Sequence, residues 1–274
     1  MTDDRSFAGL IAEGDAVPTA GWDFSWFDGR ATEERPRWGY ARQLAERIGR
    51  ADAVLDIQTG GGEVLADALR SAAHRAGGQG AGGQGADERG PAVLAATESW
   101  PPNLEIARRN LAPFGGTVAH AEDDADFPFG ADSFGLVVSR HPTEVLWTEI
   151  ARVLRPGGTY FSQQVGSGSN RELTDFMMGP QPVSPSRSPQ VAVTEATAAG
   201  LDVVGLQEQA LRVEFFDVAA VVHFLKKVVW TVPGFTVAGY SEQLARMHQY
   251  IQANGAFVCY AQRFLIEARK PSGE

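Results

Sequence analysis

One short run of the chain, residues 53–65, constrains the fold more than any other. It begins as an apolar strand, is closed by Asp56, passes through the glycines at 60–62 and continues into a helix. Glycines at such a turn let the backbone approach a ligand closely, because they carry no Cβ atom. The helix that follows directs its positive N-terminal end toward the same space. The run therefore predicts a site for a cofactor that bears a nucleoside.

The composition narrows the classes of partner. The chain has 274 residues, is 43% hydrophobic and carries a formal net charge of -10. Without a cluster of Lys and Arg there is no electrostatic footprint for nucleic acid, so we expect a small-molecule acceptor and no nucleic acid. The single Cys259 leaves too few thiols for a cysteine zinc site, and we expect no metal. The acidic first residues and the lack of an apolar stretch of about 18 residues predict a cytoplasmic protein that does not enter a membrane.

Strands and helices alternate after the glycine turn. Strands are expected at 92–97, 117–120, 134–139 and 159–164, and helices at 63–75, 102–111 and 143–154. This alternation predicts a parallel sheet covered on both faces. Ligands of such sheets bind beyond the carboxyl ends of the strands. Asp56, Glu98, Asp123 and residues 139–141 all fall at those ends.

The two ends of the chain differ from this middle part. Residues 1–50 are expected to form an N-terminal arm, rich in aromatic residues, and a cap helix. Residues 51–274 would form the cofactor-binding domain, with lid helices inserted at about 212–256 before a last strand at 264–268. The glycine-rich segment 77–90 is typical of a surface loop, and no role is predicted for it.

Four motifs in order along the chain resemble those of the class I S-adenosylmethionine-dependent methyltransferases. They are the glycine turn with Asp56, Gly60 and Gly62; Glu98 after the second strand; Asp123 with Phe127-Pro128-Phe129 and Asp132-Ser133-Phe134; and Arg152-Val153-Leu154-Arg155-Pro156-Gly157-Gly158. The resemblance implies an α/β Rossmann-like fold with a mostly parallel seven-stranded sheet, helices on both faces and a C-terminal helical lid. It implies S-adenosylmethionine as the cofactor. Gln58 departs from the family, which has a glycine there, and Gly135 stands where an Asp is common.

Cofactor contacts are expected from the first strand ends. The carboxylate of Glu98 suits the two hydroxyls of a ribose, as in dinucleotide folds. Asp123 suits an adenine amino group, and the backbone of Asp124 suits a ring nitrogen. Trp100 either stacks on the adenine or is structural. The full set of predicted cofactor residues is Asp56, Gln58, Thr59, Gly60, Gly62, Glu98, Trp100, Asp123, Asp124 and Ser139.

Acceptor contacts are expected from the later strand ends and from the two ends of the chain. His141 is predicted as a general base or as a group that orients the acceptor, and Arg140 as a partner for an acceptor carboxylate. The alternative is that His141 and Arg140 are both structural residues, with Arg140 in a salt bridge. The predicted substrate residues are Trp26, Gln163, His223 and Trp230.

The sequence favours an enzyme that moves a methyl group to an O, N or C nucleophile of a small molecule, with a secondary metabolite as one expected class. The alternative is a cofactor-binding protein of the same fold that has a non-methylating or regulatory role. A nicotinamide dehydrogenase shares the strand, glycine turn and acid, but the Arg155-Pro156-Gly157-Gly158 turn favours the methyltransferase. Monomer and homodimer are both open.

Overall fold

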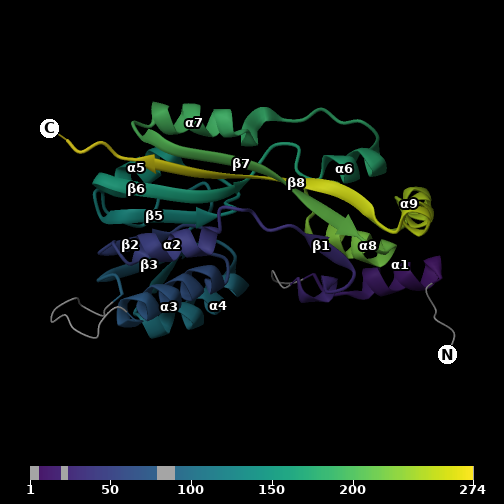
Figure 1. Cartoon of the computed structure of the whole chain (residues 1–274), viewed down its shortest axis with the longest axis horizontal. Helices are drawn as coiled ribbons and strands as arrows, with labels where there is room; N and C mark the ends of the chain where they lie inside the picture. Colours follow the sequence, from purple (N-terminus) through teal and green to yellow (C-terminus); the bar gives the residue numbers. More distant parts are fainter. Residues whose placement is uncertain (1–5, 20–23, 79–89, 274) are drawn as a thin grey trace. The chain divides into compact units, whose positions relative to one another are not determined.

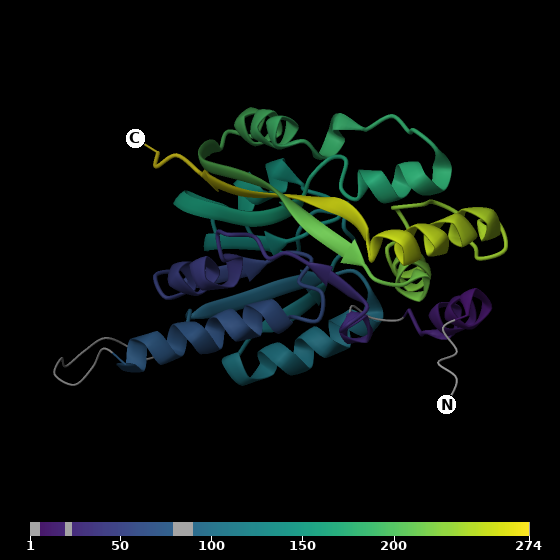
Figure 2. The same cartoon turned by 45° about the vertical axis from the view of Figure 1, so that its right-hand side comes forward.

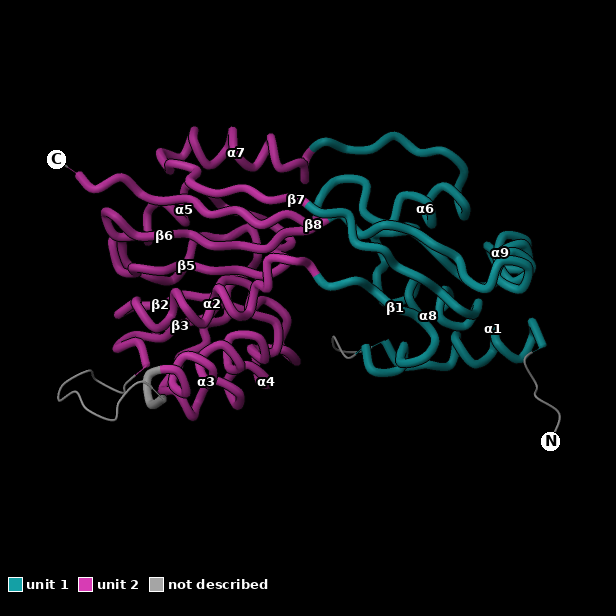
Figure 3. Tube along the Cα trace, viewed as in Figure 1, with its two compact units in different colours: residues 1–35, 166–185, 209–262 teal, residues 36–165, 186–208, 263–274 magenta. Residues whose placement is uncertain are grey.

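A computed structural model of the chain describes residues 6–19, 24–78 and 90–273, which form two compact units (Figure 3). Unit 1 contains residues 1–35, 166–185 and 209–262; unit 2 contains residues 36–165, 186–208 and 263–274. This division does not follow the expected boundary at residue 50, because the helix at 40–48 packs in the core of unit 2. Most of the glycine-rich segment 77–90 lies outside the described residues.

Unit 2 is built on a mostly parallel sheet with the strand order β7-β8-β6-β5-β2-β3-β4 (Figure 1). The strands are β2 (Ala53–Asp56), β3 (Val93–Glu98), β4 (Thr117–His120), β5 (Phe134–Arg140), β6 (Leu154–Val165), β7 (Asp202–Phe215) and β8 (Phe257–Arg269). The pairs from β6 to β4 are parallel, and β8 is antiparallel to β6. The last parts of β7 and the first residues of β8 belong to unit 1. This confirms the predicted Rossmann-like arrangement.

Helices cover both faces of this sheet because successive strand residues point to opposite sides. Val54 packs with side chains of α2, α3 and α4, whereas Leu55 packs with side chains of α5 and α7. Figures 1 and 2 show helices on both sides of the sheet. Their bounds are α2 (Tyr40–Ile48), α3 (Glu63–Gly78), α4 (Pro101–Leu111), α5 (Trp147–Val153) and α7 (Pro189–Ala198). The register of the parallel strands pairs Asp56 with Ala96 on one side and Val138 on the other. The ends of β2, β3 and β5 therefore meet at one edge.

Unit 1 has its own core around α8 (Val218–Lys227). Asp217 caps this helix by accepting a hydrogen bond from the Ala220 N–H at 2.8 Å, which satisfies one of the free N–H groups at the helix start. Eight of its ten residues are buried, so the helix is core on all sides. The remaining elements of unit 1 are α1 (Phe7–Ala16), β1 (Ala31–Glu33), α6 (Arg171–Met178) and α9 (Ser241–Asn254). Short 3-10 turns cover Ser25–Phe27, Ala112–Phe114 and Pro185–Arg187 along the chain.

Two features of unit 1 differ from the prediction. The N-terminal stretch expected as an arm contains α1, which packs against α8 so closely that a Cβ at Gly14 would lie 2.4 Å from the Ala219 carbonyl oxygen. It also contains β1, which pairs antiparallel with the end of β7 through Ala31 and Phe215. The described sheet therefore has eight strands instead of seven. The helices α8 and α9 do stand between β7 and β8, as predicted.

The helices in the described ranges are each too short or too polar to cross a bilayer.

Candidate functional site

The glycine turn of unit 2 has the geometry of a ligand cradle. Gly60 and Gly62 have positive φ angles of 63° and 75°. A Cβ at Gly60 would have nothing within 4 Å, so this side of the turn is open. A Cβ at Gly62 would lie 3.3 Å from Leu111 Cγ, which lets the turn pack closely on α4. The two glycines thus have different roles: Gly62 lets the turn pack on α4, and Gly60 leaves open space beside the turn.

Glu98, at the end of β3, accepts hydrogen bonds with both carboxylate oxygens, and one of these bonds comes from the glycine turn. Its Oε2 accepts from the Gly60 N–H at 2.8 Å, and its Oε1 accepts from the Trp100 N–H at 2.9 Å. The side chain is buried, and burial raises the pKa of its carboxyl. Each oxygen keeps a second lone pair. The carboxylate is therefore placed beside the open side of Gly60 with capacity for hydroxyl donors.

Asp56, at the end of β2, is buried as well. Its carboxylate accepts from the Thr59 hydroxyl at 2.6 Å, and burial raises its pKa to about 7. Both groups thus brace the turn from within. A direct contact of either with a cofactor stays a prediction.

Gln58, where the family has a glycine, ties the turn to the loop that follows β5. Its backbone is left-handed, with φ 55°, which is uncommon for a residue with a side chain. Its Oε1 accepts from the Thr143 N–H at 2.6 Å and its Nε2 donates to the Glu144 carbonyl at 2.8 Å. The Gln58 amide is therefore hydrogen-bonded to the backbone of Thr143 and Glu144, whereas the sequence predicted a contact with the cofactor.

The predicted adenine-side residues lie near the same loop. The Thr143 hydroxyl donates to Asp123, so this acid is linked to Gln58 through Thr143. Asp124 is exposed, and Trp100 is 40% exposed, so its indole has a face open to stacking. These contacts join two of the predicted cofactor residues, Gln58 and Asp123, through Thr143.

Ser139 belongs to a buried cluster. Its hydroxyl lies 2.8 Å from the Tyr160 hydroxyl and 2.8 Å from the Ser162 hydroxyl, and its side chain is fully buried. Its carbonyl accepts from the Tyr40 hydroxyl at 3.0 Å. The hydroxyl thus already has two partners in the core, and the predicted contact between Ser139 and the cofactor stays a prediction.

His141 and Gln163 are brought together at the ends of β5 and β6. The Nε2 atoms of the two side chains are 2.8 Å apart, and the His141 N–H donates to the Gln163 carbonyl at 2.7 Å. Burial, followed by the charges of Arg140 and Arg263, holds the pKa of His141 well below its usual value. Sequence reasoning missed Trp38, whose indole N–H donates to Gln163 Oε1 at 2.8 Å. The exposed Arg140 stands at the end of β5 beside His141.

The other predicted substrate residues are in unit 1. Trp26 lies edge-on to the His223 ring, with centroids 5.0 Å apart, and Phe27 stacks on that ring at 5.0 Å. His223 is fully buried, and its Nδ1 has no hydrogen-bond partner among the described residues. Trp230 is 58% exposed. Trp26 and His223 therefore form one cluster, and a shared site with Gln163 of unit 2 stays a prediction.

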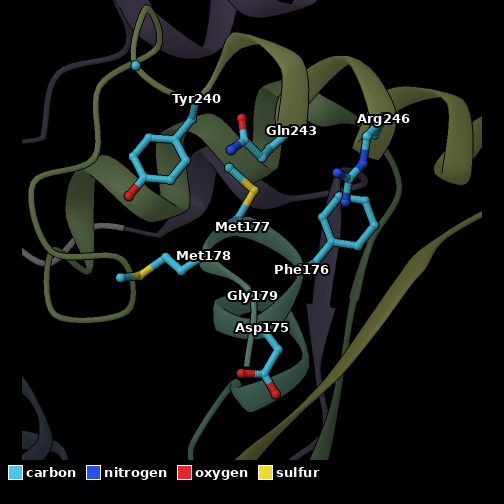
Figure 4. Close-up of a pocket in the computed structure, with 9 residues that line it drawn as sticks. Asp175, Phe176, Met177, Met178, Gly179, Tyr240, Gln243 and Arg246 are labelled. Atoms are coloured by element: carbon cyan, nitrogen blue, oxygen red, sulfur yellow. The ribbon is translucent and has the colours of Figure 1, made fainter. Parts of the chain in front are cut away.

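A hollow of about 610 Å³ lies between α6 and α9 of unit 1 (Figure 4). The Arg246 guanidinium lies 5.2 Å from the centroid of the Phe176 ring. Gln243 of α9 and Tyr240, which directly precedes α9, also line the hollow. None of the residues that line this hollow is among the predicted site residues.

Residues 55–162 match the model of a family described as the methyltransferase domain. Among solved structures, the fold is similar to that of a Bacillus halodurans protein assigned as a methyltransferase, with 17% identity, a TM-score of 0.53 and coverage of 84% of this chain and 98% of that one. A Galdieria sulphuraria protein assigned as a sarcosine dimethylglycine methyltransferase has 14% identity, a TM-score of 0.50 and coverage of 98% and 99%. The Bacillus subtilis YcgJ protein has 17% identity, a TM-score of 0.52 and coverage of 84% and 98%. No curated protein is significantly similar in sequence.

Proposed function

Because the chain belongs to the class I S-adenosylmethionine-dependent methyltransferase family, we propose that it moves the methyl group of S-adenosylmethionine to an O, N or C nucleophile of a small molecule. One observation carries the proposal: the open side of Gly60, which has no atom within 4 Å of an added Cβ, beside the buried Glu98 carboxylate. An open, left-handed glycine next to a hydroxyl acceptor fits the ribose of a nucleoside.

The residues of unit 2 would share the work of binding. Glu98 would accept from the ribose hydroxyls and Asp123 from the adenine amino group, with the Asp124 N–H and the Trp100 ring completing the adenine site. Asp56, Thr59 and the turn carbonyls would hold the amino-acid end. When bound, the cofactor supplies an electrophilic methyl group on a sulfonium with a good leaving group. The chain then has only to orient the acceptor and exclude water.

The acceptor would meet this site at His141, Arg140 and Gln163. Trp26, His223 and Trp230 of unit 1 are the further candidates for acceptor binding. We expect a small organic acceptor, with a secondary metabolite as one class, because a net charge of -10 disfavours nucleic acid. A cytoplasmic location and a monomeric or homodimeric state are part of the same proposal.

Titration calorimetry with S-adenosylhomocysteine tests the proposal. We expect micromolar binding by the wild type and a loss of at least about tenfold in Gly60→Ala, because the new methyl group enters the open space and strains the backbone. Gly115→Ala is the matched control: Gly115 also has a left-handed φ, of 70°, and open space around it, so it carries the strain without touching the turn.

Two results would count against the proposal. Equal loss of affinity in both glycine variants would mean that strain alone matters, and no binding of either S-adenosylmethionine or S-adenosylhomocysteine to the wild type would refute a cofactor site. Tight binding with no labelled product across a broad acceptor panel would favour the non-methylating alternative. The side chain of Gln58, engaged with Thr143 and Glu144 where the family has a glycine, is the observation that keeps this alternative open.

A further inference from the structure

Three side chains of unit 2 form a hydrogen-bonded chain that ends on His141. The indole N–H of Trp38 donates to Gln163 Oε1 at 2.8 Å, and Gln163 Nε2 lies 2.8 Å from His141 Nε2. Trp38 and Gln163 are buried, with exposed fractions of 6% and 3%. A buried chain of this kind has few other arrangements open to it, because an unpaired polar atom in the core costs free energy.

The direction of every hydrogen bond in this chain follows from Trp38. An indole N–H can only donate, so the oxygen of the Gln163 amide must face it. The amide NH₂ group must then face His141, where it can only donate. His141 Nε2 must therefore accept, and the single proton of the neutral ring must sit on Nδ1.

The surroundings of His141 also keep the ring neutral. A proton on Nε2 would set two donors against each other at 2.8 Å. The charged groups that act on the ring are both cationic, Arg140 on β5 and Arg263 on β8, and together with burial they lower its pKa. The backbone of His141 has φ 57° and its N–H is bonded to the Gln163 carbonyl, so Gln163 fixes both the ring and the main chain.

We infer that His141 acts on the acceptor as a hydrogen-bond donor through Nδ1–H and not as its general base, with Trp38 and Gln163 as positioning residues. Among the described residues, nothing accepts a hydrogen bond from His141 Nδ1, and the ring is half-buried. The donor is therefore free for a ligand.

This inference rests on the proposed function for its consequence about substrate. An acceptor that suits a neutral donor presents a hydrogen-bond-accepting atom, such as a carbonyl, carboxylate or phenolate oxygen, next to the atom that is methylated. Because the Nε2 lone pair of His141 is used by Gln163, His141 does not take the proton of the nucleophile, which is either deprotonated before it binds or loses its proton to another group. The substrate class is thus an anionic or carbonyl-bearing small molecule.

The tautomer can be measured without any acceptor. In protein labelled with ¹⁵N-histidine, long-range proton–nitrogen spectra near pH 7 should show a protonated Nδ1 and an unprotonated Nε2 for His141, assigned by its loss in His141→Gln. In Trp38→Phe the amide is released from the indole and is free to rotate, so we expect a mixture of tautomers. Trp147→Phe is the matched control, because Trp147 is an equally buried tryptophan of unit 2 whose N–H is bonded to Glu195 instead.

A second variant covers the case in which Trp38→Phe fails to fold. In Gln163→Glu the carboxylate can still accept from Trp38 but cannot donate, so the His141 proton should move to Nε2 or the ring should become charged. A wild-type ring that is protonated on Nε2, or a tautomer that neither variant changes, would overturn the inference. S-adenosylhomocysteine binding is measured separately. If the protein shows the expected tautomer but does not bind S-adenosylhomocysteine, the proposed function alone is refuted. If the protein binds S-adenosylhomocysteine but His141 is protonated on Nε2, this inference alone is refuted.

Discussion

At the scale of single residues, the buried acid Asp56 should make the stability of the protein depend on pH. Burial raises its pKa in the folded state to about 7, whereas an unfolded Asp titrates near 4. Between pH 4 and pH 7 Asp56 holds a proton in the folded chain that it releases in the unfolded chain. The contribution of Asp56 to the free energy of unfolding is therefore fully present below about pH 4 and is lost as the pH rises through 7. From pH 4 to 8, the unfolding free energy of Asp56→Asn should therefore rise relative to that of the wild type by on the order of 4 kcal/mol.

Urea unfolding of both proteins without cofactor, from pH 4 to 8, measures this difference. Asp52→Asn is the control, because Arg155 lowers the pKa of that exposed acid and reverses the sign. The stability that Asp52 contributes is fully present above about pH 4 and is lost only as the pH falls through its lowered folded pKa, so the difference in unfolding free energy between Asp52→Asn and the wild type should stay nearly constant from pH 4 to 8. Parallel curves for the wild type and Asp56→Asn would show that Asp56 is not buried in this way.

The sequence predicts some residues of the site well and others not at all. Asp56 and Glu98 were found because a strand end and a glycine turn are local patterns. Trp38 was missed because its partner Gln163 is 125 positions away, and only the folded sheet brings them together. The burial of Ser139 was missed for the same reason: its partners Tyr160 and Ser162 lie on the neighbouring strand. Tertiary hydrogen bonds leave no trace in local spacing.

At the scale of elements, strands and helices were predicted more reliably than their ends. The helix α9, Ser241–Asn254, falls within the lid region expected at about 212–256. The helix expected over 143–154 begins only at Trp147, because the Thr143 N–H and the Glu144 carbonyl are bound to the side chain of Gln58. The strand β6 begins at Leu154 instead of 159, since its first residues pair through Phe134 and Lys270. In each case a distant partner overrides the local signal.

The contact between Gln58 and this loop yields a prediction for the element as a whole. Gln58→Gly removes the hydrogen bonds that hold residues 143 and 144, so exchange of the Thr143 amide should speed up by about tenfold or more. The free energy of unfolding should change by less than about 1 kcal/mol, because relief of the left-handed backbone, about 1–2 kcal/mol, offsets the lost bonds. Hydrogen exchange followed by mass spectrometry, with urea unfolding alongside, checks both.

Gln58→Met separates the contribution of the left-handed backbone from that of the side-chain hydrogen bonds. The methionine keeps the strained backbone but loses the amide, so its loop should exchange as fast as in Gln58→Gly while its stability falls by about 1–2 kcal/mol. If the Thr143 amide stays protected in both variants, the loop is held by something other than Gln58. The Arg187 guanidinium, which donates to the Thr143 carbonyl at 2.8 Å, would then be the next group to remove.

At the scale of the whole molecule, the two units have separate hydrophobic cores. The core of unit 1 is centred on α8, whereas unit 2 has one core on each face of its sheet. The strands β7 and β8 pass from one unit to the other, but the parallel pairs that define the glycine turn lie in unit 2 alone. Separate cores favour unfolding of unit 1 while unit 2 stays folded.

Gly14→Leu tests whether the units open separately. A side chain at Gly14 would meet the Ala219 carbonyl at 2.4 Å, so it should push α1 from α8 and destabilise unit 1 by about 2 kcal/mol or more. Amides of α8 should then exchange about 30-fold faster, while those of β5 in unit 2 keep their protection. Ala16→Leu adds the same side chain at an exposed position of α1 and should change neither. If β5 lost protection in step with α8, unfolding would be cooperative across the chain, because the continuous strands β7 and β8 would then transmit the loss of one core to the other.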